Sequence, residues 1–517
     1  MFAFASKGQY SWGVAAGGAG VDISKGIKIS AKNEILIWGD IAGNPKFDNV
    51  TYSGRGLADG FVAIYNQSGS LKWVKLFGGT QNDRIHAADV HNNGEIYVTG
   101  HFEDSITVEN VGLKSKGLRD IFVAKLDSAG KLIWLKSFGT QADEQSSSLV
   151  ADGDGNFYLS GSFKSQLQFG SVSLSSTNIF SESFIVKFDN NGNAIWGINS
   201  TSQRVNGINS LALSPNDDVV FCGSYSLSYS IGGINVNTSS PDGEIIIGKV
   251  DKNGNLKWLK SAGGPYEDNA NGVAVSNEGN IAITGYSLGV SNFDNYQISN
   301  SGYNDAFIAL YDSSGSCRWA VECGGSGLDI GYGVCFDNNE NVYATGMFDR
   351  RMKVENIEIT GQDFDIFSLS LNINGDLRWL KQSGDLSTDC GLGIAVDDNN
   401  NIFTTGYYMF RALFGTILLP IGNAEDIFLS KMNPPLLSID NNEKNSFTIY
   451  PNPANKLIYI QAKEESEKVT LYNTNLQTIL SKQNTSILDV SHLENGLYFL
   501  SFENQKNKVI KKLIIQH

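Results

Sequence analysis

Cysteine and proline are scarce in this chain, and their scarcity narrows the classes of protein to which it can belong. The five cysteines are an odd number and include no CxxC pair, which argues against a disulfide framework and against a zinc site. Nine prolines stand against 56 glycines, a balance typical of many tight turns. No apolar run reaches the roughly 20 residues that a membrane-spanning helix requires. We therefore expect no transmembrane segment and no metal centre.

Positive charge is also in the minority. Lys and Arg number 39 against 54 Asp and Glu, a net charge of -15, and such a surface repels a phosphate backbone. Nucleic acid is therefore excluded as a partner class. Hydrophobic residues make up 41% and aromatic residues 11%, which indicates a folded chain. The opening MFAFAS has two interpretations, a signal-peptide remnant over residues 1–7 or the end of an ordinary strand.

Seven of the eight tryptophans recur at a nearly constant interval of 60 to 62 residues. A period of this length indicates an array of one repeated supersecondary unit. The tryptophans of the series are Trp12, Trp73, Trp134, Trp196, Trp258, Trp319 and Trp379.

Each repeat predicts four short antiparallel strands. Apolar residues alternate with a period of two, as in Phe122, Ala124 and Leu126, which is typical of strands. Asx and Gly residues between strands, as in Asp127-Ser-Ala-Gly130, predict hairpin turns. Both tight turns of a repeat then lie on one face, and two longer connectors lie on the opposite face. Variable connectors on a rigid scaffold are where function is expected.

The repeats are out of phase with the ends of the chain. The series begins on a Trp strand and stops on Asp426-Ile-Phe-Leu-Ser-Lys-Met432, after which no Trp strand follows. If the first strand completes the last sheet, the ring has no free edge. The sequence therefore predicts a seven-bladed β-propeller over residues 8–432, with four-stranded antiparallel blades and a ring closed by the N-terminal strand.

The repeat also matches a known pattern. The unit D-x-F-V-A-K-x-D-x-x-G-x-x-x-W, followed by GG, an Asp, G-V-A-V and Y-V-T-G, resembles the SBBP-type β-propeller repeat of many bacterial surface proteins. The resemblance supports the fold and implies no single activity.

The sequence changes character after residue 432. Asn433-Pro-Pro435 ends the last strand, and residues 433–446 are expected to form a polar linker. Several alternating segments follow within residues 447–517, LIYIQA among them, and they predict a small β-sandwich. The fold class is therefore all-β throughout.

The tail carries the motifs YPNP, V-x-L-Y-N, L-x-N-G-L-Y and KK-x-I-I. Together they resemble the type A C-terminal sorting domain of the type IX secretion system of Bacteroidetes. The resemblance implies a secreted or outer-membrane cell-surface protein, the type IX machinery as partner, and removal of the tail on export. It implies a sorting role for Tyr450, Pro451, Asn452, Pro453, Gly496, Tyr498, Lys511 and Lys512. One departure is Asn475-Leu476, where the family commonly has Gly; Asn tolerates the left-handed conformation.

An Asp stands ten residues after most tryptophans of the series, nine in one repeat. These aspartates could form a ring at one mouth of the central channel that binds cations or sugar hydroxyls. Alternatively, each caps its own loop by accepting backbone N–H groups. Recurrence in nearly every repeat favours the capping role. The residues are Asp22, Asp83, Asp143, Asp268, Asp329 and Asp389, with Asn206 in the remaining repeat.

Asp152-Gly-Asp-Gly-Asn156 has the opening of a calcium loop but lacks the later Gly and the Glu at the twelfth position. Because it fills a hairpin-turn slot, we interpret it as a turn and keep Ca²⁺ as the alternative. No other cofactor is expected.

No nucleophile elbow, HExxH motif or phosphate-binding loop is present, and no catalytic residue is assigned. Connector carboxylates remain eligible for polysaccharide cleavage: Glu103, Asp104, Asp294, Asp349 and Glu355. Tyr408 and Phe410 break the repeat pattern and could stack on sugar rings.

The leading hypothesis is a non-enzymatic module that binds a glycan or a surface protein through its connector face. The alternatives are a polysaccharide hydrolase or lyase that uses connector carboxylates, and a structural spacer of the cell surface.

Overall fold

The computed structural model divides the chain into two units, each described by itself. Residues Gln9–Pro434 form one unit, called the repeat domain below, and the other is the C-terminal domain. Residues 1–8, including the signal-peptide candidate, lie outside the described part, as does the linker from residue 435 to 447. The structure describes residues 9–176, 179–202, 204, 207–238, 240–300, 302–434, 448–461, 468–473, 478–483, 485–503 and 508–517.

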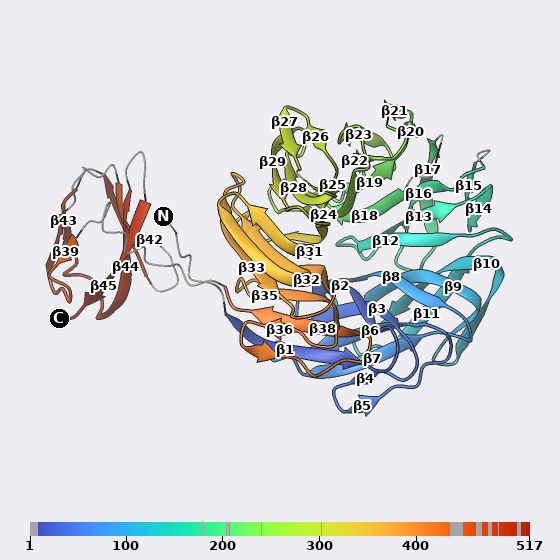
Figure 1. Cartoon of the computed structure of the whole chain (residues 1–517), viewed down its shortest axis with the longest axis horizontal. Helices are drawn as coiled ribbons and strands as arrows, with labels where there is room; N and C mark the ends of the chain where they lie inside the picture. The colour runs from blue at the N-terminus through green and yellow to red at the C-terminus, as the bar shows by residue number, and fades with distance from the viewer. Residues whose placement is uncertain are drawn as a thin grey trace. The chain divides into compact units, whose positions relative to one another are not determined.

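The repeat domain consists of antiparallel sheets with an inner, a second, a third and an outer strand in that order (Figure 1). The inner strands are β2 (Ile23–Ile29), β8 (Asp83–Val90), β12 (Gln145–Ala151), β18 (Gly207–Leu213), β24 (Asn269–Val275), β30 (Ile330–Phe336) and β34 (Asp389–Val396). The second strands are β3 (Ile35–Ile41), β9 (Ile96–Val108), β13 (Phe157–Phe163), β19 (Val219–Tyr225), β25 (Ile281–Ser287), β31 (Val342–Val354) and β35 (Ile402–Met409).

The other two strands of each sheet lie farther from the centre. The third strands are β6 (Asp59–Tyr65), β10 (Val111–Leu126), β16 (Glu182–Phe188), β22 (Glu244–Val250), β28 (Asp305–Tyr311), β32 (Ile357–Leu371) and β38 (Glu425–Met432). The outer strands are β7 (Leu71–Phe77), β11 (Leu132–Phe138), β17 (Ala194–Ser202), β23 (Leu256–Ala262), β29 (Cys317–Cys323), β33 (Leu377–Ser383) and β1 (Tyr10–Gly17).

The first and last strands of the repeat domain belong to one sheet. Strand β1 pairs antiparallel with β38, with Trp12 opposite Lys431 and Val14 opposite Leu429. The inner strands contact one another in series, and β34 contacts β2. In Figure 1 the sheets are arranged around a common centre. The domain is therefore propeller-like, with an N-terminal strand that completes the last sheet as the phase of the repeats predicts.

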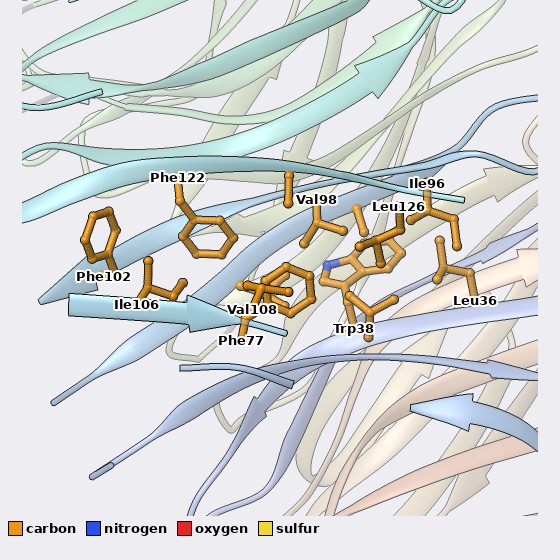
Figure 2. Packing of buried hydrophobic residues seen from close by; sticks show 14 of the residues in the cluster. Leu36, Trp38, Phe77, Ile96, Val98, Phe102, Ile106, Val108, Phe122 and Leu126 are labelled. Atoms are coloured by element: carbon orange, nitrogen blue, oxygen red, sulfur yellow. The ribbon is translucent and has the colours of Figure 1, made fainter. Parts of the chain in front are cut away.

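Apolar clusters fill the space between neighbouring sheets. One cluster joins Leu36 and Trp38 of β3 to Val98 of β9 and Phe122 of β10, and Figure 2 shows these side chains interdigitating between the two sheets. Because both faces of a sheet are covered, every residue of the third strand Asp59–Tyr65 is buried. Another cluster, which includes Ile27 and Phe403, joins the last sheet to the first.

Six of the seven tryptophans of the series pack an outer strand against the next tight turn. Trp258 Nε1 donates a hydrogen bond to the Ser313 carbonyl at 3.3 Å. A Cβ atom on Gly315, whose φ is +82°, would stand 2.9 Å from the Trp258 ring. Glycine therefore serves two needs at this turn, the left-handed backbone and the space for the indole.

The long connectors are ordered β-hairpins. Strands β9 with β10 and β31 with β32 extend past their sheets to form two of them. Close to the hairpin turn, one strand of the hairpin pairs with the end of the preceding outer strand, as Thr107 does with Gly78. The other hairpins are β4 (Lys46–Phe47) with β5 (Val50–Thr51), β14 (Gln166–Phe169) with β15 (Val172–Ser175), β20 (Ser228–Ile231) with β21 (Ile234–Asn237), β26 (Val290–Phe293) with β27 (Tyr296–Ser299), and β36 (Leu413–Phe414) with β37 (Ile417–Leu418).

The C-terminal domain contains two small antiparallel sheets around one apolar core that includes Ile458, Leu471 and Leu500. Such packing agrees with the small β-sandwich predicted from the tail. One sheet contains β39 (Thr448–Tyr450), β40 (Leu457–Gln461) and β43 (Ile487–Asp489), and the other contains β42 (Thr478–Gln483), β41 (Lys468–Tyr472), β44 (Gly496–Glu503) and β45 (Lys508–Ile515). Among the described residues, no helix has the length and apolarity to cross a membrane.

Candidate functional site

The recurrent aspartates are buried at the entrance to the inner strands. Asp329 Oδ2 accepts the backbone N–H of Gly325 at 2.8 Å, and its Oδ1 accepts that of Asp349 at 3.1 Å. Asp22 and Asp389 bind equivalent backbone N–H groups. Asp22, Asp83, Asp268, Asp329 and Asp389 all have zero exposed surface. They therefore have the geometry of loop caps, and no exposed ring of carboxylates forms from them.

A second buried acid, Asp365 of the third strand β32, lies beside the cap Asp389. Asp365 Oδ1 and Asp389 Oδ2 converge on Gly384, where a Cβ atom would lie 2.2 and 2.6 Å from them. Burial raises the pKa of Asp389 to about 8 and that of Asp365 to about 7; the hydrogen bonds that each carboxyl accepts lower the pKa in part, and repulsion by neighbouring carboxylates raises it further. The glycine at the end of the outer strand thus leaves space for a carboxyl pair.

Asp143 differs from the other predicted aspartates. Its neighbour Glu144, ten residues after Trp134, is buried and accepts the N–H of Thr140 at 2.9 Å, the bond that the caps make elsewhere. Asp143 instead forms a two-point ion pair with Arg119, with Oδ1 2.6 Å from Nε. The prediction was therefore one residue off in this repeat. Asn206, the remaining counterpart, lies outside the described residues.

Asp152, the candidate calcium ligand, has the contacts of a turn residue. Its Oδ1 accepts the N–H groups of Asp154 and Asn156 at 3.1 and 2.8 Å. Asp337, in the equivalent turn of another repeat, accepts the corresponding N–H groups of Asn339 and Asn341. Within the described residues, no three His, Cys, Asp or Glu side chains are grouped as metal ligands.

Some of the connector residues that the sequence predicts as binding residues are buried, and others are exposed. Tyr408 is 1% exposed, and its hydroxyl donates to the Pro420 carbonyl at 2.9 Å; its ring is therefore part of the core, contrary to the prediction that it faces a ligand. Phe410 is 54% exposed and stays a candidate. The hairpin-tip acids Asp294 and Glu355 have positive φ and accept the N–H groups of Cys317 and Leu377.

A channel of about 600 Å³ lies between the inner strands of the repeat domain. One layer of its wall is formed by residues that bulge out of the inner strands, one from each, because each inner strand has an extra residue opposite its second strand. We call this layer the bulge ring. Its members are Lys25, His86, Ser147, Asn209, Asn271, Tyr332 and Leu392.

The bulge ring was not predicted, although a sequence signal for it exists. Each member stands thirteen residues after a tryptophan of the series. At this position the repeats carry cationic, imidazole, hydroxyl, amide, phenol and aliphatic side chains, whereas the next position carries only Gly, Ala or Ser. A β-bulge re-aims a side chain and is often found beside functional sites. The bulge ring therefore differs from the rest of the scaffold in that its residue type varies from repeat to repeat.

Charged groups near the bulge ring are paired with opposite charges. Lys25 Nζ lies 2.5 Å from Asp40 Oδ2, and Arg84 Nη1 lies 3.1 Å from the same oxygen. His86 Nε2 and His101 Nδ1 are 2.8 Å apart. Burial, reinforced by nearby cations, lowers the pKa of His101 to about 3 and that of His86 well below its usual value. Both imidazoles are therefore neutral at physiological pH.

Several bulge-ring side chains also connect neighbouring sheets. Lys25 Nζ donates to the Ile85 carbonyl at 3.1 Å. Asn209 Nδ2 donates to the Ala270 carbonyl and Asn271 Nδ2 to the Gly331 carbonyl, each at 2.9 Å. Ser147 makes its bond within its own sheet, to Ser160 Oγ at 2.8 Å. The side chains are thus held in defined positions around the channel.

In the C-terminal domain, motif residues from both ends of the tail meet. Asn452 Oδ1 accepts the N–H of Ile514 at 2.8 Å. Tyr450 stacks on Tyr459 with ring centroids 5.7 Å apart, and the Tyr498 hydroxyl donates to the Glu494 carbonyl at 3.0 Å. Gly496 begins β44, and Lys511 lies in β45. The side chain of Lys512 lies outside the described residues.

Comparison with known proteins assigns the tail. Residues 448–516 match the family of secretion system C-terminal sorting domains. This match implies handling by the type IX secretion system and export to the cell surface or the medium.

The repeat domain is similar to WD-repeat and propeller proteins. The uncharacterized WD repeat-containing protein L264 of Acanthamoeba polyphaga mimivirus is 21% identical over 367 residues, which cover 57% of this chain and 26% of that protein. The chain thus matches about a quarter of the length of this relative. The WD40 β-propeller domain of Doa1 is 11% identical with a TM-score of 0.40, covering 81% of this chain and 96% of its own. Sqt1 from Chaetomium thermophilum is 11% identical with a TM-score of 0.40, covering 77% and 97%.

Proposed function

We propose that this protein is a secreted or cell-surface binding module of Bacteroidetes, built as a seven-bladed, SBBP-type propeller that recognises a glycan or a protein without chemical turnover. The sorting-domain match over residues 448–516 supports export. Pairing of β1 with β38 and contact of β34 with β2 support ring closure.

The observation that carries the binding role is the bulge ring. The scaffold places one side chain from each sheet around a channel, and these side chains are of six different kinds. Sites of this kind, a concave hollow with a few fixed polar groups, are typical of ligand recognition. The recurrent carboxyls, by contrast, are buried and engaged in capping, so they are not available to a polymer in solution.

Connector carboxylates offer less support for polysaccharide cleavage. Two of the eligible acids, Asp294 and Glu355, hold hairpin tips against outer strands through backbone N–H groups. A glycosidase needs two carboxyls about 5 to 10 Å apart beside a substrate groove. The binding role is therefore the better supported of the two.

The test is a screen of the full chain against immobilised cell-surface polysaccharides and surface proteins, with analysis of soluble products in the same wells. We expect saturable binding without release of oligosaccharides. Release of defined oligosaccharides that stops in a single Asp or Glu variant would establish the hydrolase or lyase instead. Absence of any saturable ligand would favour the spacer.

A further inference from the structure

We propose that the bulge ring binds a neutral, hydroxyl-rich ligand, the class to which short oligosaccharides belong. This inference rests on the proposed binding function and names its ligand class and its place. The channel of about 600 Å³ falls within the range of about 300–1,000 Å³ typical of small-molecule sites.

The backbone bulge is common to all the inner strands, whereas the side chain that it carries differs between most of them. Its presence in every inner strand shows that the backbone irregularity belongs to the fold. The fold alone would be satisfied by the same residue in each repeat, as it is at the tryptophans of the outer strands. Different side chains at equivalent backbone positions instead create an asymmetric wall, and an asymmetric wall distinguishes one ligand orientation from another.

Charge compensation indicates that the ligand is neutral. Asp40 is paired with both Lys25 and Arg84, and Arg119 is paired with Asp143. Farther along the channel, Lys28 Nζ lies 3.8 Å from Asp89 Oδ1. An ionic ligand would have to compete with these ion pairs, which is costly in a confined site. The cost is lower for an anion than for a cation, because Lys25 and Arg84 share the single carboxylate of Asp40, and the anionic comparator below tests this case.

The uncharged side chains of the bulge ring are complementary to a sugar. Ser147, Asn209 and Asn271 present hydroxyl and amide groups, which both donate and accept hydrogen bonds as sugar hydroxyls do. Tyr332 and Leu392 occupy adjacent sheets and give the wall one apolar sector. A pyranose has hydroxyl edges and an apolar face of C–H groups, so both sectors have a counterpart on the same ligand.

Ser147 is the position at which the site can be blocked with least damage to the ring. Its hydroxyl bonds to Ser160 in the same sheet and not to a neighbouring sheet. The S147Y substitution should fill the channel with a phenol ring. The matched control is S314Y, because Ser314 is exposed in a tight turn, away from the channel wall.

The experiment measures binding of the full chain to neutral trisaccharides of glucose, mannose, galactose and xylose by titration calorimetry, with trigalacturonic acid as the anionic comparator. We expect at least one neutral trisaccharide to bind, and S147Y to weaken that binding by about tenfold or more, equivalent to about 1.4 kcal/mol. S314Y should bind as the unmodified chain does. If S147Y does not fold, L392S takes its place, since loss of the apolar sector should weaken the same binding.

Three outcomes would overturn the inference: tighter binding of trigalacturonic acid than of any neutral sugar, binding unaffected by both channel variants, or no trisaccharide binding. If a polysaccharide or protein from the wider screen still binds and S147Y leaves it unchanged, only the channel inference fails. If nothing binds in either experiment, the proposed binding function fails as well.

Discussion

At the scale of single residues, the repeated positions of this chain are explained by contacts between neighbouring sheets. Six of the seven tryptophans of the series lie against the glycine of the next tight turn. Trp379 precedes the seam between β38 and β1, where the chain has no such turn, and its Nε1 has no hydrogen-bond partner among the described residues. The tryptophan–glycine contact is therefore a property of repeats joined by a turn.

Replacement of Gly315 by Ala should destabilise the repeat domain more than replacement of Gly155 by Ala. Both glycines have φ near +80°, but a Cβ atom at Gly315 meets the Trp258 ring at 2.9 Å, whereas at Gly155 the nearest atoms lie at 3.6 Å. The left-handed backbone costs about 1 kcal/mol in each variant. Displacement of the indole should add about 1–3 kcal/mol in the first. Thermal unfolding followed by circular dichroism measures the difference; equal melting temperatures would contradict the Trp contact.

The buried carboxyls make stability depend on pH. Burial raises the pKa of Asp329 to about 7 and that of Asp389 to about 8, above the value of about 3.9 in an unfolded chain. Between these values the folded state holds more protons than the unfolded state, so the free energy of unfolding falls as pH rises. We expect the melting temperature to decrease from pH 5 to pH 9.

The Asp329→Asn variant should show a flatter decrease, although its melting temperature is lower throughout because one amide N–H faces another donor. The control is Asp376→Asn, at an exposed turn residue, and its slope should equal that of the unmodified chain. A melting temperature that is constant or rises over this pH range would contradict the assignment of protonated caps.

At the scale of elements, the connectors have a different role from the one expected of variable loops. They form hairpins in which one strand pairs, close to the turn, with the preceding outer strand. Acids at two of the turns accept N–H groups of the outer strand that follows. The length and variability of the connectors can be read from the sequence. Their pairing cannot, because each hairpin pairs with a strand of another sheet. Only the side chains that remain exposed at their tips are free for recognition.

Substitutions of Tyr408 and Phe410 test, within one connector, the difference between a packed and an exposed side chain. Tyr408→Ala should lower stability by about 3–5 kcal/mol, the usual cost of deleting a buried aromatic ring. Phe410→Ala should change stability by less than about 0.5 kcal/mol, since its ring is exposed. Chemical denaturation measures both. A large loss for Phe410→Ala would place its ring in the core and remove it from the candidate binding residues.

At the scale of the whole molecule, the order of strands and the pairing of the first with the last strand of the repeat domain could be predicted from the sequence. Periodic tryptophans, Asx-Gly turns and the phase offset are all local signals, and they determine which strands are neighbours. The bulge ring escaped prediction because a bulge is a relation between two strands. The cap of the Trp134 repeat escaped it because Asp143 has the side chain of the other caps, whereas Glu144 has their ten-residue spacing from the tryptophan.

If the C-terminal domain is removed on export, the mature protein ends at a defined position. If the C-terminal domain is a sorting signal that is removed, mass spectrometry of protein released from the producing cell should find a chain that ends before Tyr450. Deletion of residues 448–517 should keep the protein inside the cell. Released protein that retains His517 would contradict removal of the domain.

The number of ligands bound per chain tests most directly whether function lies where the repeats differ. Recurrent residues such as the buried caps would give several equivalent sites, whereas an asymmetric channel gives a single one. Titration calorimetry of the full chain with a ligand from the screen yields this stoichiometry. We predict one ligand per chain; several equivalent sites per chain would contradict the assignment of function to the channel.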